Sequence, residues 1–313
     1  MRSLFLIACM MLLVGCMIGP DYKRPDINTP DSFRYATQEA QDTANLTWWR
    51  QFHDPVLDGL INEALANNKT VKIAAANVEQ AVGILTQARS PLFPQLSYGG
   101  SAARQRGSEM NATPIPPTVP NPQNAYQVLA GATWEIDLWG RIRRITEAAQ
   151  ANVLATEEAR RGIILSLMAS VANTYIQLLG LDEQLVIAKQ NLVSYGEAVK
   201  LIELQHRYGQ VSKMTVEQAR TQYETAAATI PQIESQIVQT EDALSILLGR
   251  NPGPITRGKS MRDLALPPVP AGLPSQLLTR RPDLAQAEQN LIAANAQDRC
   301  GKGPLFPHNI TDR

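Results

Sequence analysis

The chain has 313 residues, and its 29 lysines and arginines are balanced by 29 aspartates and glutamates, which gives a formal net charge of zero. A neutral chain has no electrostatic case for a nucleic-acid partner. Apolar residues make up 44% of the chain and aromatic residues only 5%, a balance that comes from small aliphatic side chains and favours helix-on-helix packing.

Cysteine and histidine are scarce, with three residues of each in the whole chain. Their wide separation predicts neither a disulfide framework nor a metal site. Acidic pairs such as Glu157-Glu158 and Glu135/Asp137 have no implied partner base. The sequence therefore predicts a protein that is not an enzyme and has no cofactor or metal.

The first 15 residues have the layout of a secretory signal peptide, with Arg2 before a short apolar run that ends at Gly15. Leu13-Val14-Gly15-Cys16 resembles the bacterial lipobox, in which the cysteine is lipidated and becomes the new amino terminus. An ordinary signal peptide with a chance cysteine is the alternative. Because Met17 is not an aspartate, the resemblance points to a lipid anchor on Cys16 in the outer membrane.

Residues 16–54 are predicted to be an extended segment, since prolines recur at positions 20, 25 and 30. From Asp54-Pro55 the apolar residues repeat at intervals of three and four, which predicts a helix from Pro55 to about Arg89.

The period changes to two after that helix, which predicts a β-hairpin at about residues 94–138. The second strand alternates apolar and polar residues, with Tyr126 and Trp134 near its ends. A transmembrane β-barrel strand with aromatic belts and a half-buried soluble hairpin both explain this pattern.

The next segment, residues 139–207, contains no proline, and from Thr174 to Ile202 its apolar positions step by four and three. This spacing predicts a very long helix with a coiled-coil seam. Gly209 ends it, and a return helix at 212–248 has the same spacing, with a kink or unwinding expected at Pro231. The long helices favour the barrel interpretation of the hairpin.

Residues 249–274 are rich in glycine and proline and are predicted to form an irregular linker. Helical spacing resumes at 275–297. An offset of 213 residues aligns Thr70-Val71 with Asp283-Leu284 and Asn77 with Asn290. We interpret this helix as the start of a second repeat, although two alanine-rich helices can also match by chance.

Several motifs together resemble the NodT-type outer-membrane lipoproteins of resistance-nodulation-division efflux systems, which are relatives of TolC. They are Gly19-Pro20-Asp21-Tyr22 with Arg24-Pro25, Trp48-Trp49 with Asp54-Pro55, the run from Trp134 to Arg141, and Arg281-Pro282-Asp283-Leu284. The resemblance covers residues 13–297. It implies a mainly α fold in which long antiparallel helices line a periplasmic α-barrel and the hairpin joins a trimeric transmembrane β-barrel.

The resemblance also implies a function: passive export from an inner-membrane pump, through a periplasmic adaptor, to the outside. The hairpin tip formed by Tyr208, Gly209, Gln210, Val211 and Ser212 is similar to the family's adaptor-docking turn. Tyr126 and Trp134 would lie in the aromatic belts of the barrel. A periplasmic coiled-coil scaffold lipoprotein without channel activity remains the alternative.

The last residues, 298–313, depart from the family pattern. One inserted G before codons for Ile-Gly-Ala-Ala-Lys-Gly-Arg-Tyr-Phe-Pro-Thr-Ile-Ser-Leu-Thr-Gly reproduces all of them. A frameshift near residue 298 is therefore expected, giving a truncated, inactive channel. The rival explanation is that Pro304-Leu305-Phe306-Pro307 repeats Pro91-Leu92-Phe93-Pro94 at the offset of 213.

Replacement of the lipidation cysteine tests the anchor directly. We expect Cys16→Ser to abolish incorporation of labelled palmitate, because the serine hydroxyl does not replace the thiol in lipid attachment. Cys300→Ser is the matched control and should leave the label unchanged. Persistent labelling of the Cys16→Ser chain would contradict the lipobox prediction.

Overall fold

The structure is a computed structural model. It describes residues 21–30, 47–108, 110, 116, 120–265 and 274–302. These residues group into two compact units. Unit 1 takes its described residues from Met1–Pro25, Glu79–Ala155 and Ala287–Arg313, and unit 2 takes them from Asp26–Val78 and Thr156–Gln286.

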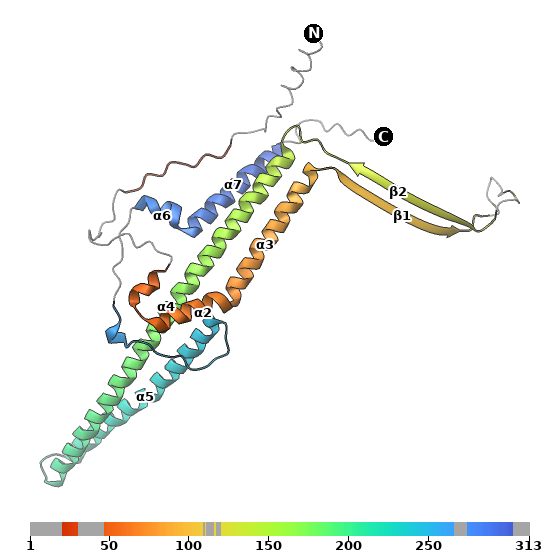
Figure 1. Ribbon diagram of the computed structural model, residues 1–313. Helices are drawn as coiled ribbons and strands as arrows, with labels where there is room; N and C mark the ends of the chain where they lie inside the picture. The colour runs from red at the N-terminus through yellow and green to blue at the C-terminus, as the bar shows by residue number, and fades with distance from the viewer. Residues whose placement is uncertain are drawn as a thin grey trace. The chain divides into compact units, whose positions relative to one another are not determined.

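Helices dominate the described chain, as predicted (Figure 1). The prediction of a mainly α fold with long helices is confirmed. The elements are η1 (Trp48–Phe52), α2 (Pro55–Asn67), α3 (Lys69–Arg89), η2 (Ser90–Leu92), β1 (Gln95–Gln105), β2 (Gln123–Thr133), α4 (Arg141–Arg207), α5 (Lys213–Leu248), η3 (Met261–Asp263), α6 (Pro274–Arg280) and α7 (Pro282–Lys302).

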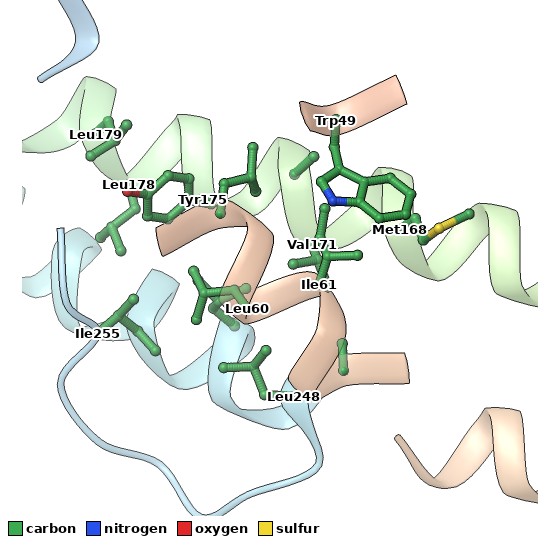
Figure 2. Close-up of a cluster of buried hydrophobic side chains, with 14 of the residues drawn as sticks. Trp49, Leu60, Ile61, Met168, Val171, Tyr175, Leu178, Leu179, Leu248 and Ile255 are labelled. Carbon is green, nitrogen blue, oxygen red and sulfur yellow. The ribbon is translucent and has the colours of Figure 1, made fainter. Parts of the chain in front are cut away.

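The hydrophobic core of unit 2 forms where η1, α2, α4 and α5 meet (Figure 2). Leu57 and Ile61 of α2 and Leu244 of α5 are completely buried. Helix α4 is long and apolar enough to cross a membrane by length and composition alone. Because Val171 and Leu178 of α4 are also completely buried in this core, we assign the apolar stretch of α4 to protein packing.

The predicted single helix from Pro55 to Arg89 is instead two helices, with a break at Asn68. Asn68 has an extended ψ of 129°, and its side-chain oxygen accepts hydrogen bonds from the amides of Thr70 and Val71 at 2.8 and 3.2 Å. Its side-chain nitrogen donates to the Leu247 carbonyl oxygen at 2.8 Å. The break therefore comes from a tertiary contact that helical periodicity does not report.

The α4–α5 pair is antiparallel, and α5 returns along the second half of α4 (Figure 1). Arg220–Glu203 and Lys189–Glu234 ion pairs join the two helices. A side chain at Gly196 would meet the Tyr223 ring at 3.4 Å, so the helices approach closely there. Every predicted seam position from Val216 to Leu247 is buried or half-buried. Helix α5 continues through Pro231, where the sequence predicted a kink or unwinding.

The second helical segment is also divided, since α6 ends at Arg280 and α7 begins at Pro282. The predicted helix over 275–297 is wrong in being continuous, because a proline restricts the residue before it and has no amide hydrogen to donate. Helix α7 starts and ends 213 residues after α3. This match of bounds agrees with the offset that the sequence suggested for a repeat.

Gly249 allows a test of the packing between α2 and α5. It has a φ of 75°, and a Cβ there would lie 2.6 Å from the Asn67 carbonyl oxygen. We expect Gly249→Ala to destabilise the chain by more than about 2 kcal/mol, because left-handed backbone costs an alanine about 1–2 kcal/mol and the Asn67 backbone must also move. The measurement is thermal unfolding followed by circular dichroism.

Gly209→Ala is the matched control, since Gly209 has a φ of 74° and open space around it. This variant should lose only about 1–2 kcal/mol. Equal losses in the two variants would show that the contact with Asn67 is unimportant.

Candidate functional site

The hairpin of unit 1 pairs β1 with β2 in an antiparallel register from Gln95↔Thr133 to Gln105↔Gln123. This register places the apolar residues of both strands on one face, which we call the apolar face. Its members are Leu96, Tyr98, Gly100, Ala102, Tyr126, Val128, Ala130 and Ala132. The opposite face carries mainly glutamine, serine, threonine and small residues. Every residue of both strands is exposed.

The predicted belt residues lie toward opposite ends of the second strand. Tyr126 is 78% exposed and pairs with Ala102 near the loop end. Trp134 is 58% exposed, follows the last residue of β2, and donates its indole N–H to the Leu92 carbonyl oxygen at 3.2 Å. The structure therefore separates them along the strand, as two belts require.

Charged residues fix the base of the hairpin to the start of α4. Asp137 accepts hydrogen bonds from the amides of Ile142 and Arg143 at 3.1 and 3.0 Å, and so caps α4. Glu135 forms a bidentate pair with Arg141, with its shorter contact at 2.7 Å. Both acids of the Glu135/Asp137 pair therefore have structural partners.

The segment that follows the predicted anchor also belongs to unit 1. Asp21 forms an ion pair with Arg144 at 3.0 Å, and Arg24 pairs with Glu288 of α7 at 3.0 Å. Arg144 is buried, which disfavours its charge, but the carboxylates of Glu147 and Asp21 outweigh burial and raise the pKa of Arg144. Sequence analysis missed these contacts. Cys16 itself lies outside the described residues.

The predicted docking tip is the turn between α4 and α5. Tyr208 is 73% exposed, and Gly209 has the left-handed φ of 74° that favours glycine. Ser212 accepts a hydrogen bond from the Thr215 amide and caps α5. His206, which sequence analysis did not single out, donates from Nδ1 to the Val211 carbonyl oxygen at 2.9 Å. The tip is thus an ordered turn with exposed side chains.

A buried polar cluster in unit 2 was also missed. Asp54 caps α2 through the Val56 amide and accepts the Tyr175 hydroxyl at 2.9 Å and the Lys259 amide at 3.3 Å. The Tyr175 oxygen accepts the Gly258 amide at 2.9 Å. A Cβ at Gly258 would lie 2.1 Å from an Asp54 oxygen, so the linker passes the carboxylate too closely for any side chain.

Arg257 fixes the same linker from its other side. It contacts Asp182 of α4 at 2.8 Å and also pairs with Glu241 of α5. Hydrogen bonding to Asp182 outweighs partial burial, and with Glu241 it raises the pKa of Arg257. Within the described ranges, no group of three His, Cys, Asp or Glu side chains is arranged to hold a metal ion.

Comparison with known proteins agrees with this geometry. The model of the outer membrane efflux protein family matches residues 60–250. The toluene efflux pump outer membrane protein TtgC of Pseudomonas putida is 34% identical over 95% of this chain, and the cation efflux system protein CusC of Escherichia coli is 31% identical over 95%. The solved outer-membrane channel OprN superposes with a TM-score of 0.79 at 29% identity, covering 93% of this chain and 65% of OprN.

The chain belongs to the outer membrane efflux protein family. The predicted family, outer-membrane location and absence of enzyme activity are thereby confirmed. The chain spans 62% of the length of TtgC and 64% of that of CusC. Residues 303–313 lie outside the described residues, and the frameshift stays a prediction.

The Tyr175 cluster predicts a loss of stability at alkaline pH. Burial, helped by Asp54, raises the pKa of Tyr175 from 10.0 to about 12 against the lowering effect of the Gly258 amide. A pKa that is higher in the folded chain adds stability below pH 10, and that stability is lost as pH rises from 10 to about 12. Tyr175→Phe should remove this component of the pH dependence of the thermal midpoint.

At neutral pH, Tyr175→Phe should cost about 1–3 kcal/mol, because two buried groups lose a partner. Tyr195→Phe, at an exposed position of α4, is the control and should change stability by less than about 0.5 kcal/mol. Identical pH profiles for the native chain and the Tyr175→Phe variant would contradict the role of this hydroxyl.

Proposed function

We propose that this chain is the outer-membrane channel component of a tripartite efflux system, a passive export duct that docks to a periplasmic adaptor. The observation that carries the proposal is the register of the hairpin, which collects the apolar side chains of two fully exposed strands on one face. Such a face suits lipid, and the polar face suits a water-filled channel.

The dimensions of the hairpin support a membrane-spanning role. Each strand has 11 residues, and a tilted transmembrane strand needs about 9–11 residues. Strand edges are not tolerated in lipid, so the two strands require neighbours from other hairpins. We infer that the hairpin joins a closed β-barrel in a homotrimer.

The α4–α5 pair would form part of the periplasmic tunnel, with its tip at the adaptor. Ordered, exposed Tyr208 and Gln210 flank Gly209 there, and an inner-membrane pump would deliver cargo through the adaptor. Lipid on Cys16 would anchor the chain in the outer membrane. No cofactor or nucleic acid takes part in this proposal.

The cargo is not set by the part of the channel that the structure describes. The polar face of the hairpin carries uncharged residues such as Gln95, Ser97 and Thr133, which select no charge. The names of TtgC and CusC refer to toluene and to cations. We therefore propose a duct whose substrates are chosen by the pump.

Protease protection separates this proposal from a periplasmic scaffold lipoprotein. In outer-membrane vesicles, a transmembrane hairpin protects residues 126–138 from added protease, whereas a soluble hairpin leaves them open to cleavage. Heat-modifiable gel mobility reports barrel formation independently. Cleavage within β2 in intact membranes would reject the channel in favour of the scaffold.

The docking role of the tip predicts the effect of a charge at Gly209. We expect Gly209→Glu to abolish crosslinking of the chain to a purified periplasmic adaptor, because a bulky charge enters the turn that meets the partner. Gly209→Ala has the same left-handed backbone penalty without the charge and should retain most crosslinking. Full crosslinking by the glutamate variant would reject docking at this turn.

A further inference from the structure

Positive charge on the hairpin is confined to its loop end. Between Gln95 and Thr133 the sequence contains two cationic residues, Arg104 and Arg106. Arg104 is the penultimate residue of β1, and Arg106 follows that strand directly. Both side chains are exposed. The remaining positions of β1 and β2 carry no charge.

Arg104 extends the apolar face. It pairs with Asn124, and it follows Leu96, Tyr98, Gly100 and Ala102 at the two-residue interval of that face. An arginine on a lipid-facing surface costs about 2–4 kcal/mol at the bilayer midplane and about 0–1 kcal/mol near an interface. The position of Arg104 along the strand therefore decides whether its charge is tolerated.

The register gives that position relative to Trp134. Asn124, the partner of Arg104, lies ten residues before Trp134. Ten residues at about 3.3 Å each cover about 33 Å, or about 25 Å along the membrane normal at a tilt of about 40°, which equals the height of a typical apolar band. With Trp134 at the periplasmic interface, Arg104 reaches the outer interface and Arg106 lies just beyond it.

The backbone next to these arginines is held in place. The Asn121 side chain accepts a hydrogen bond from the Gly107 amide at 2.9 Å and donates to the Gly107 carbonyl oxygen at 3.0 Å. This two-way contact closes the loop end of the hairpin one residue after Arg106. The two guanidinium groups are thus presented from an anchored backbone.

We propose that Arg104 and Arg106 bind the phosphate groups of lipid A, the anionic lipid of the outer leaflet. This inference rests on the proposed function, because it requires the hairpin to span the outer membrane. Guanidinium groups pair with phosphate through parallel, charge-assisted hydrogen bonds. At the opposite end, the Glu135–Arg141 pair balances its own charge, so the hairpin attracts anionic lipid at its outer end.

The test measures lipid A retained by the chain after reconstitution in phosphatidylcholine vesicles doped with diphosphorylated lipid A. The double variant Arg104→Gln/Arg106→Gln should retain roughly 10-fold less lipid A or lower still, since each arginine near an anionic surface contributes about a 5-fold factor. Vesicles doped with phosphate-free lipid A should show weak, equal retention by the native chain and the variant.

The control variant Arg161→Gln/Arg220→Gln removes the same charge from exposed positions on α4 and α5 and should retain lipid A like the native chain. Protease protection of β2 is measured on every sample. Protection with unchanged retention in the Arg104/Arg106 variant would overturn the lipid A site alone. Loss of protection in the native chain would overturn the channel and the lipid site together.

Discussion

The buried Asp54 carboxylate is the interaction on which unit 2 depends. It caps α2, accepts the Tyr175 hydroxyl of α4 and accepts the Lys259 amide of the linker. A carboxylate removed from water is stable only when its oxygens are hydrogen-bonded, so these three segments must assemble together. The α4–α5 pair that continues from this core to the tip therefore has a fixed base.

Periodicity predicted the elements whose stability depends on local spacing. The seam from Val216 to Leu247 and the alternation from Tyr126 to Leu138 are visible in the sequence because each repeat places side chains on one face. Caps at Asp54, Ser212 and Gly249 also follow from residue type. The bounds of α4 and α5 accordingly lie within two residues of those predicted.

Contacts between distant residues were beyond the reach of such spacing. The break at Asn68 depends on the Leu247 carbonyl group, and the burial of Arg144 depends on Asp21. No sequence interval connects these residues, and asparagine in a helical stretch is only a weak signal for a break. The tip differs, since Gly209 was predicted from residue type while His206 was overlooked.

The exposed hairpin shows why unit 1 makes sense only within an assembly. A two-stranded hairpin is at best marginally stable in water, yet both faces and all residues of β1 and β2 are open here. Asp137, Glu135 and Trp134 attach its base firmly to neighbouring segments, but none of these contacts covers the apolar face. The free energy that stabilises the strands must therefore come from lipid on that face and from neighbouring strands at both edges.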